Sequence, residues 1–395
     1  MSIMIKQAVI LAAGEGQRLR PFTVSKPKAM LAIAGRPIID YVIEAVVKNG
    51  INDVVLVLGY HKEQVLDWLS INEPSGLEIT CVTQANQLGS AHALAQVEPY
   101  VKDDFLVLPG DKLIEASTIA QFIHADPQAV MAKRVDNPSR YGVLTIEKDL
   151  LKVITEKPRD PSSNIINTSV YAFNKKVFDF IRPELDIPDV LNKMVSRGIA
   201  ISTHETQGVW LDVVYPWDIL NLNGVVLRHL STSLGGQVEA LVAIKGQVNI
   251  GKGTIIHSNS YLAGPLTIGE NCDIGPNVCL MAATSIGDNV SISPFTEITN
   301  SIISNDVIIG SGCTIQDSVI DQGCNIKGHL TAFSGDAEVE INGEHHRVNL
   351  GAILGEGCTL DYGVVAHPGV ILGNNSQVRA MKLINGHLPD RSLVL

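Results

Sequence analysis

The chain has 395 residues, which exceeds one ordinary domain and predicts two. Its formal net charge of −11 argues against nucleic acid or an anionic membrane as the main partner, and its 45% hydrophobic content fits a well-packed protein. No apolar run approaches the ~20 residues that span a bilayer, and residues 1–6 lack the pattern of a signal peptide. We therefore expect a cytoplasmic location with no membrane partner.

Residues 1–225 alternate between strand-like and helix-like segments. Strands are predicted at Gln7–Leu11, Asp53–Gly59, Ile79–Thr83 and Phe105–Leu108, and helices at Pro37–Lys48, His61–Leu69 and Ser90–Gln96. This alternation predicts an α/β domain with a Rossmann-like, mostly parallel sheet and helices on both faces. Such sheets bind ligands at the carboxyl ends of their strands, where the segments around Gly14 and Gly110-Asp111 lie.

A segment rich in glycine and cations follows the first predicted strand. Residues 9–21 read VILAAGEGQRLRP, and Lys26-Pro27-Lys28 comes soon after. Glycines let backbone N–H groups approach a phosphate chain, and Arg18 and Lys28 supply positive charge to neutralise it. The segment lacks the Gly-Lys-Ser/Thr of a P-loop and the third glycine of the dinucleotide fingerprint. It therefore predicts a phosphate site of another kind.

After a linker at 226–236, residues 237–395 show a period of six. Aliphatic residues recur at this spacing from Ile250 to Ile298, from Ile303 to Ile326 with one shorter step, and from Leu354 to Val378. Such a period predicts a β-solenoid with an aliphatic column along its axis. Glycines that directly follow column residues, such as Gly251 and Gly287, are expected to supply permissive backbone at the corners.

Four cysteines occupy one position of this repeat. Each lies two residues before a column aliphatic, at Cys272, Cys313, Cys324 and Cys358. We interpret them as small inward-facing residues and not as zinc ligands or nucleophiles, because the chain has no Cys-x-x-Cys.

The repeat breaks at 328–350. Alternation around Asn342-Gly343 predicts an inserted β-hairpin that carries His345 and His346. An exposed histidine pair is the simpler interpretation. Contact with a ligand or a neighbouring subunit is the alternative.

The N-terminal segment, with Gly35-Arg-Pro37 at its end, resembles the sugar-1-phosphate nucleotidylyltransferases. The six-residue repeats resemble the left-handed β-helix of the hexapeptide transferases, which usually form trimers. Over its whole length the chain is similar to bifunctional N-acetylglucosamine-1-phosphate uridylyltransferase/glucosamine-1-phosphate acetyltransferases, especially the archaeal relatives. It is also similar to glucose-1-phosphate thymidylyltransferases with β-helix tails. The resemblance implies a homo-oligomer, a trimer or a multiple of it.

The resemblance also implies roles for individual residues. Arg18 and Lys28 are the expected catalytic cations, and Asp111 and Asp212, both just past apolar segments, are the expected Mg²⁺ ligands. The simpler alternative is that each aspartate caps a helix or a turn. The expected nucleotide-binding residues are Leu11, Ala12, Gly14, Gly16, Gln84 and Gly89. Gln84 would read a pyrimidine edge or, in the simpler alternative, cap the next helix. The expected sugar-binding residues are Gly142, Glu156 and Asn167, and Ser169 departs from the family's glycine.

The predicted function is formation of a nucleotide-sugar and pyrophosphate from a sugar-1-phosphate and UTP or dTTP. One alternative is a bifunctional enzyme that also acetylates an amino-sugar-1-phosphate from acetyl-CoA. Against it, Ser311 and Thr314 stand where acetylating relatives carry histidine and tyrosine, and a hydroxyl without a nearby base cannot take the amine proton. A second alternative is a non-catalytic regulatory or scaffold subunit.

Overall fold

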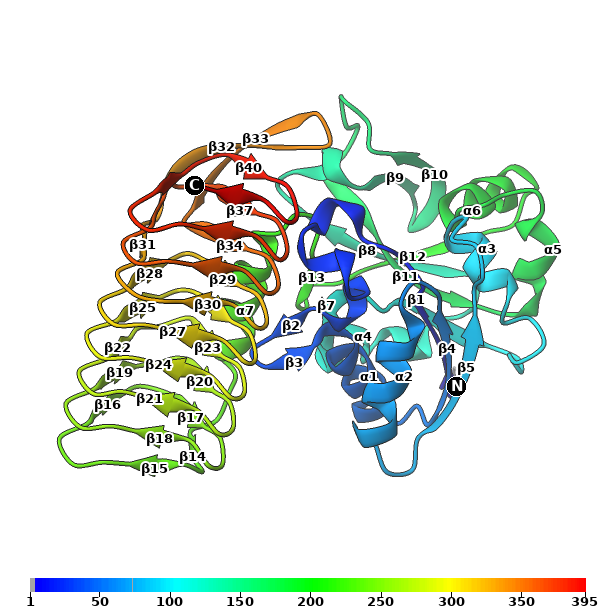
Figure 1. The fold of residues 1–395 in the computed structure, drawn as a ribbon. Coiled ribbons are helices and arrows are strands. Elements are labelled where there is room, and N and C mark those ends of the chain that lie inside the picture. Colours follow the sequence, from blue (N-terminus) through cyan, green and yellow to red (C-terminus); the bar gives the residue numbers. More distant parts are fainter. Residues whose placement is uncertain (1–3, 73) are drawn as a thin grey trace. The chain divides into compact units, whose positions relative to one another are not determined.

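The computed structural model describes residues 4–72 and 74–395, and the chain divides by its contacts into two compact units (Figure 1). Unit 1 comprises the chain up to Glu15, Lys26–Met30 and Pro37–Asp212, and unit 2 comprises Gly16–Ser25, Leu31–Arg36 and Val213–Leu395. Residues 1–3, on which the expectation of no signal peptide partly depends, lie outside the described residues. A search of the described residues finds no helix with the length and apolarity that crossing a bilayer requires.

Unit 1 is built on a mixed β-sheet. In order across the sheet its described strands are β5 (Glu78–Thr83), β4 (Asp53–Leu58), β1 (Gln7–Ala12), β6 (Phe105–Pro109), β11 (Ile165–Phe173), β8 (Ala129–Arg134), β12 (Ser202–Glu205), β10 (Leu150–Glu156) and β9 (Gly142–Glu147). The first four are mutually parallel, so their carboxyl ends share one edge. The four strands predicted from the sequence are confirmed.

Helices of unit 1 cover both faces of this sheet. They are α1 (Ile38–Lys48), α2 (Lys62–Asn72), α3 (Ser90–Ala95), α4 (Ala116–Ile119), α5 (Phe178–Ile181) and α6 (Ile187–Ser196). Alternate residues of β4 belong to different cores: Val54 packs in the cluster that contains α1 residues, and Val55 in the cluster that contains α3 residues. The side-chain period of two in a strand produces this division, and it confirms the α/β fold class.

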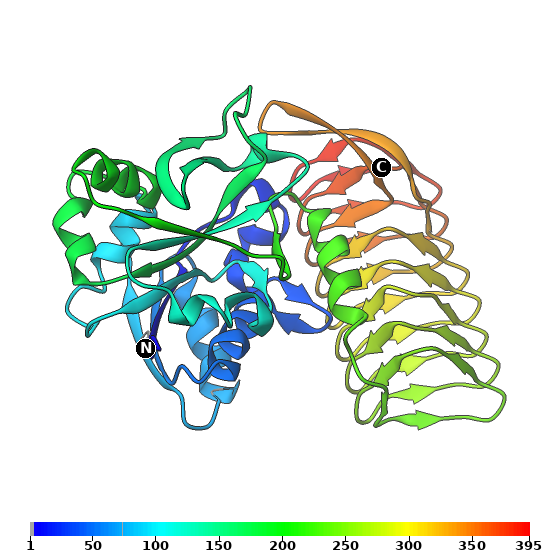
Figure 2. The same ribbon diagram turned by 180° about the vertical axis from the view of Figure 1, so that it is seen from behind.

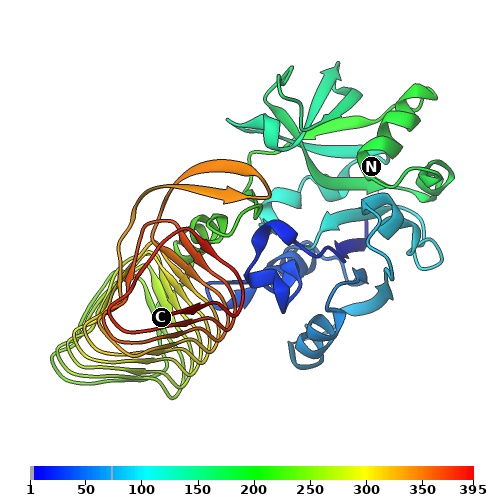
Figure 3. The same cartoon turned by 45° about the horizontal axis from the view of Figure 1, so that its top comes forward.

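Unit 2 is mainly a left-handed parallel β-helix of three sheets, which Figure 3 shows obliquely from its C-terminal end. The first sheet contains β14 (Ser233–Leu234), β17 (Val248–Ile250), β20 (Leu266–Ile268), β23 (Thr284–Ile286), β26 (Ile302–Ile303), β29 (Val319–Ile320), β34 (Ala352–Leu354), β37 (Val370–Leu372) and β40 (His387–Leu388). The second contains β15 (Gln237–Val238), β18 (Ile255–Ile256), β21 (Asp273–Ile274), β24 (Ser291–Ile292), β27 (Ile308–Ile309), β30 (Asn325–Ile326), β35 (Thr359–Leu360), β38 (Gln377–Val378) and β41 (Leu393–Val394). The third contains β16 (Ala243–Lys245), β19 (Tyr261–Ala263), β22 (Cys279–Leu280), β25 (Glu297–Thr299), β28 (Thr314–Gln316), β31 (Thr331–Ala332), β36 (Val365–Ala366) and β39 (Leu383–Ile384).

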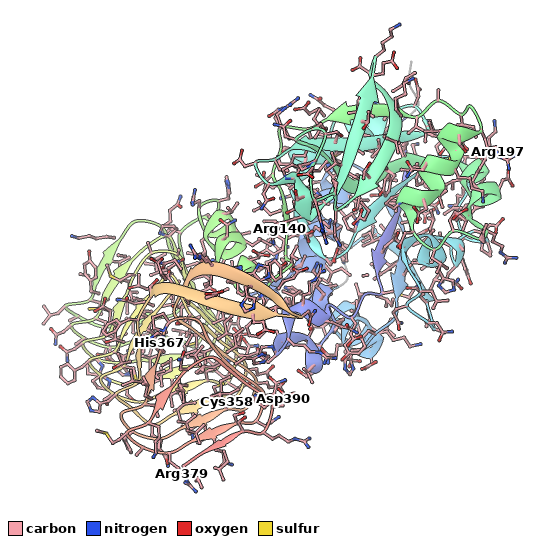
Figure 4. The ribbon with its side chains drawn as sticks, turned by 90° about the horizontal axis from the view of Figure 1, so that it is seen from above. Arg140, Arg197, Cys358, His367, Arg379 and Asp390 are labelled. Carbon is pink, nitrogen blue, oxygen red and sulfur yellow. The ribbon has the colours of Figure 1, made fainter. Side chains whose placement is uncertain are left out.

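The predicted aliphatic column is the buried core of this β-helix, from Ile250 to Val378. The cysteine prediction is confirmed as well: Cys272, Cys313, Cys324 and Cys358 are all buried in the same core. Figure 4 places Cys358, together with Asp390, in the last coils.

The expectation that the repeat glycines supply permissive backbone at the corners was wrong. Gly251 and Gly287 are absent from the positive-φ residues, which are neighbours such as Gly253 and Asn289. A Cβ on Gly287 would instead lie 2.3 Å from Oδ1 of Asn305 in the next coil. Close stacking of coils, and not backbone conformation, therefore requires these glycines.

An antiparallel hairpin interrupts the coils. It pairs β32 (Gly335–Ile341) with β33 (Glu344–Leu350) around Asn342-Gly343. The His346 ring lies 4.2 Å from the Tyr215 ring, between centroids, and Tyr215 Oη donates to Glu344 Oε2 at 3.0 Å. The hairpin is thus packed against the residues that precede α7 (Asp218–Leu227), a helix that runs along the β-helix (Figure 2).

Candidate active site

The carboxyl ends of β1 and β6 approach each other closely. The Gly110 N–H donates to Leu11 O at 2.8 Å, and a Cβ on Gly110 would lie 2.7 Å from Ala12 Cβ. Only glycine fits this approach, which brings Asp111 to the start of the glycine-rich segment. A Cβ on Gly14 would meet nothing within 4 Å, so open space surrounds that part of the backbone.

Lys28 joins the two aspartates predicted as metal ligands. Its Nζ lies 2.7 Å from Asp111 Oδ2 and 3.3 Å from Asp212 Oδ1. Asp111 and Asp212 follow Lys28 by 83 and 184 residues in the chain, and the three side chains meet at the strand edge. The structure thus brings together Lys28, Asp111 and Asp212, which the resemblance had assigned to one reaction.

A fourth charged residue, Lys112, completes this cluster, and sequence reasoning missed it. Strands β7 (Lys112–Ile114) and β13 (Trp210–Asp212) are antiparallel, and the register places Lys112 opposite Asp212. Lys112 Nζ lies 3.3 Å from Asp212 Oδ2 and 4.7 Å from the centroid of the Trp210 ring. Its position next to Asp111 was a signal, but its partner depends on strand pairing across about a hundred residues.

Opposite charges stabilise one another in this partly buried cluster. Burial alone would lower the pKa of the Lys28 ammonium, but the carboxylates of Asp111 and Asp212 raise it above its ordinary value. Burial alone would raise the pKa of Asp212, but Lys112 and Lys28 hold it well below its usual range. Lys28 and Asp212 are therefore both charged at neutral pH.

The cluster fits a divalent cation in part. No group of three or more His, Cys, Asp and Glu side chains that could hold a metal occurs among residues 4–72 and 74–395. Asp111 and Asp212 nevertheless direct carboxylate oxygens toward one cationic atom, Lys28 Nζ. Mg²⁺ is commonly held by one or two carboxylates, with water and substrate phosphates as its other ligands, so two carboxylates suffice.

Gln84 is buried beside α3. Its Nε2 donates to Gly89 O at 3.1 Å and lies 2.9 Å from His92 Nδ1, so the side chain contacts the start of α3 but does not cap its N–H groups, and the helix-cap alternative is wrong. Gly89 has φ +143°, and a Cβ there would lie 2.4 Å from Leu185 O. Both residues thus have structural roles at this position, and their contact with a base stays a prediction.

The three residues predicted to bind sugar lie together. Gly142 on β9 is opposite Glu156 on β10, and a Cβ on Gly142 would lie 2.9 Å from Glu156 Oε2 and 3.7 Å from Asn167 Cβ. Asn167 Nδ2 donates to Tyr171 Oη at 2.7 Å across a bulge in β11. Ser169, in this bulge, has φ +65°, which is the conformation that glycine adopts freely.

Arg18 and Gly16 belong to unit 2, within the segment Gly16–Ser25. Gly16 adopts the left-handed conformation, with φ +73°, and its carbonyl accepts hydrogen bonds from Thr23 Oγ1 at 2.8 Å and Leu19 N at 2.9 Å. The predicted nucleotide segment therefore has one half in each unit.

Residues 7–227 match the nucleotidyl transferase family, and residues 247–282 and 265–300 match the bacterial transferase hexapeptide repeats. The chain belongs to the nucleotidyl transferase family. Enzymes of this family generally use a divalent metal, which agrees with the paired carboxylates at the strand edge.

Two curated relatives match this nucleotidyl transferase over nearly its whole length. The bifunctional protein GlmU of Methanococcus maripaludis is 36% identical over 405 residues, which cover 98% of this chain and 96% of the relative. A bifunctional sugar-1-phosphate nucleotidylyltransferase/acetyltransferase of Sulfurisphaera tokodaii is 32% identical over 397 residues, covering 96% and 97%. Among solved structures, a putative glucose-1-phosphate thymidylyltransferase of Bacillus anthracis has a TM-score of 0.52 and 27% identity, covering 58% of this chain and 97% of that one.

Proposed function

We propose that this nucleotidyl transferase transfers a nucleotidyl group from UTP or dTTP to a sugar-1-phosphate and releases pyrophosphate. The observation that carries the proposal is the cluster of Lys28 with Asp111 and Asp212 beside the glycine-rich end of β1. The name of the S. tokodaii relative supports a sugar-1-phosphate as the acceptor.

In this reaction an ionised oxygen of the sugar-1-phosphate attacks the α-phosphorus of the triphosphate. The bond from that phosphorus to the bridging oxygen breaks, and pyrophosphate leaves with the electron pair. No general base is needed because the attacking oxygen carries no proton at neutral pH. Lys28 neutralises charge at the transferred phosphoryl group, and Arg18 neutralises charge on the triphosphate and on the departing pyrophosphate.

We propose Mg²⁺ as the metal, held by Asp111 and Asp212. When bound, it supplies positive charge to the phosphate oxygens. The role of Lys112 is to hold Asp212 ionised and oriented, since its ammonium and the Lys28 ammonium flank the two oxygens of that carboxylate.

Specificity for the base is proposed to reside in Gln84. Its Nε2 is engaged with Gly89 O and His92, which leaves Oε1 to accept a hydrogen bond from the N3–H of uracil or thymine. Gly89 would lie against the base. Gly142, Glu156 and Asn167 would contact the sugar hydroxyls, since a carboxylate and an amide suit such groups.

A matrix of nucleoside triphosphates against sugar-1-phosphates, read by pyrophosphate release, tests the proposal. We expect pyrimidine triphosphates to exceed ATP and GTP by about tenfold or more, because a buried amide matched to a pyrimidine leaves groups unpaired against a purine. Lys28→Ala should lower kcat strongly and keep a cooperative melt, whereas the matched surface variant Lys102→Ala should keep kcat. Absence of pyrophosphate release with every pair would refute the proposal.

A second candidate function is acetyl transfer, which the names of both full-length relatives favour. The positions of the histidines argue against substantial acetyl transfer. Ser311 stands at the base position, and His329 lies one coil later, where its backbone N–H donates to the backbone carbonyl of Ser311 at 2.8 Å. His346 packs against Tyr215. Release of CoA with glucosamine-1-phosphate or galactosamine-1-phosphate, lost in His329→Ala or in His345→Ala/His346→Ala, would instead establish acetyl transfer with a relocated base.

The trimer stays a prediction from the resemblance. Sedimentation of the intact chain measures it directly, and a monomer at micromolar concentration would contradict it.

A further inference from the structure

Strands β7 and β13 form a small sheet of their own within unit 1, apart from the nine-stranded sheet. Each strand has three residues, and their antiparallel register places Asp212, the last residue of β13, opposite Lys112, which directly follows Asp111. The small sheet therefore carries both aspartates of the cluster at one end. Two short strands are only marginally stable by themselves, so the position of this end depends on what holds the other end.

Thr118, in α4, holds the backbone that enters β13. Val209 O accepts a hydrogen bond from Thr118 Oγ1 at 2.7 Å and a second from the backbone N–H of Glu115 at 3.3 Å. Thr118 is buried, with 4% of its surface exposed, so its hydroxyl makes this bond largely shielded from water. A Cβ on Gly208 would lie 2.5 Å from Thr118 Oγ1, so only glycine fits this approach. The backbone that leads to Asp212 is thus fixed against α4.

Lys133 holds the same segment from the main sheet. It lies near the carboxyl end of β8, and its Nζ donates to Gly208 O at 2.8 Å. Burial lowers the pKa of the Lys133 ammonium, because the charged form loses hydration there. A partly buried charge is costly unless hydrogen bonds compensate it, so this ammonium is held to the Gly208 carbonyl.

A third contact fixes the first residue of β13. Trp210 Nε1 donates to Thr168 O at 2.9 Å, and Thr168 belongs to β11 of the main sheet. Thr168 is fully buried, and its Oγ1 donates to Met131 O in β8 at 2.7 Å. The entering end of β13 is therefore held from α4, β8 and β11, and the strand extends from this fixed end to Asp212.

We propose that Thr118 and Lys133 are positioning residues for nucleotidyl transfer. They hold β13 so that the carboxylate of Asp212 keeps its place beside Lys28. This inference rests on the proposed function, in which Asp212 is a metal ligand. Both residues act through the backbone, since their hydrogen bonds go to carbonyls that directly precede β13. The physical reason is that a charged group stabilises a transition state only when it is held in place beforehand.

The sharpest test is Thr118→Val, which keeps the size of the side chain and removes the donor to Val209 O. We expect kcat for pyrophosphate release to fall about tenfold or more, because small displacements of a catalytic group are costly. Thr118→Ser keeps the hydroxyl and should largely restore kcat. The matched control is Thr203→Val, since Thr203 Oγ1 donates to Asp149 O at 3.1 Å, away from β13. It should keep the wild-type kcat.

The second position is tested by a pair of variants. Lys133→Met keeps an unbranched side chain without the donor to Gly208 O and should lower kcat, whereas Lys133→Arg keeps a donor and should largely restore it. The matched control is Lys193→Met, because Lys193 Nζ also donates to backbone carbonyls, those of Phe180 at 3.1 Å and Arg182 at 2.6 Å. It should have no effect on kcat.

Two measurements distinguish positioning from loss of folding. If Thr118 acts through Asp212, Thr118→Val should cause no further loss of kcat in a chain that already carries Asp212→Ala. Hydrogen exchange, measured on the protein without nucleotide or metal, should become faster in residues 208–212 of Thr118→Val and stay unchanged in the main sheet.

Full kcat in both Thr118→Val and Lys133→Met, or equal losses with and without Asp212, would overturn the inference. Faster exchange throughout unit 1 would also overturn it, because it would show a role in folding alone. Failure of the proposed function would be seen separately, as absence of pyrophosphate release from the wild-type chain.

Discussion

The charged cluster of unit 1 and the aliphatic column of the β-helix bury their side chains by opposite means. The cluster joins Lys28, Asp111, Lys112 and Asp212, whose charges compensate one another where they are partly shielded from water. The column joins apolar residues that follow one another every sixth position and need no partner of opposite charge. Substitution in the cluster should therefore change chemistry first, and substitution in the column should change stability first.

The largest expected effect is on catalysis in the cluster. Asp111→Ala or Asp212→Ala should lower the rate of nucleotidyl transfer about a thousandfold, because loss of a metal carboxylate removes several kcal/mol of transition-state stabilisation. Steady-state assays at low millimolar Mg²⁺ measure this. Asp67→Ala, which removes an exposed aspartate of α2, is the control. Near-wild-type rates in both cluster variants would contradict the expectation that substitution in the cluster changes chemistry first.

The largest losses of stability are expected from substitutions in the aliphatic column of the β-helix. Ile309→Ala removes a fully buried column residue and should lower the free energy of unfolding by about 2–5 kcal/mol. The neighbouring Ile308 is 51% exposed, and Ile308→Ala should cost much less. Denaturant unfolding of the two variants compares them directly. Equal losses would show that the column is not what stabilises the β-helix.

A pair of glycines tests the packing of the coils. Gly287→Ala places a methyl group 2.3 Å from Asn305 Oδ1 and should cost about 1–3 kcal/mol of stability. Gly275→Ala meets its nearest neighbour, His257 Cδ2, at 3.4 Å and should be close to neutral. Thermal unfolding of the two variants compares their losses of stability. A costly Gly275→Ala would point to backbone conformation after all.

The smallest expected effect concerns pH. A hydrogen bond to Asp273 at 2.7 Å, and a second to Glu239 at 3.0 Å, raise the pKa of His257 on the surface of the β-helix. Because the folded pKa exceeds the unfolded value of about 6.5, this stabilisation is present below that pH and is lost as pH rises through the folded pKa. His257→Gln should therefore destabilise by about 1 kcal/mol or less at low pH, and by less at high pH. A loss that is the same at both pH values would contradict this.

The difference between the two regions also explains which of their features could be predicted from the sequence. The six-residue period predicted the column and the inward cysteines, because each coil contacts the next at a fixed separation along the chain. The same period did not reveal why Gly287 is glycine. That reason lies in its distance from Asn305, which only the stacked coils define.

Within unit 1 the sequence determined the strands, the helices and the residue types at the strand ends. Apolar runs and helical spacing are local, and they identified β1, β4, β5 and β6. The resemblance placed Lys28, Asp111 and Asp212 in one reaction. Tertiary structure alone brought Lys112 opposite Asp212, because an antiparallel pair of short strands sets that register across a long separation.

The position of Arg18 shows the same limit most clearly. The charge of Arg18 and its place after the glycines that follow the first strand are read from the sequence alone. Only the tertiary structure decided that its segment packs on the β-helix, where Pro21 and Ser25 contact Asn374 and Glu356, more than three hundred residues away. Contacts of that separation leave no period or local pattern in a sequence, since they depend on the folded surface that the rest of the chain creates.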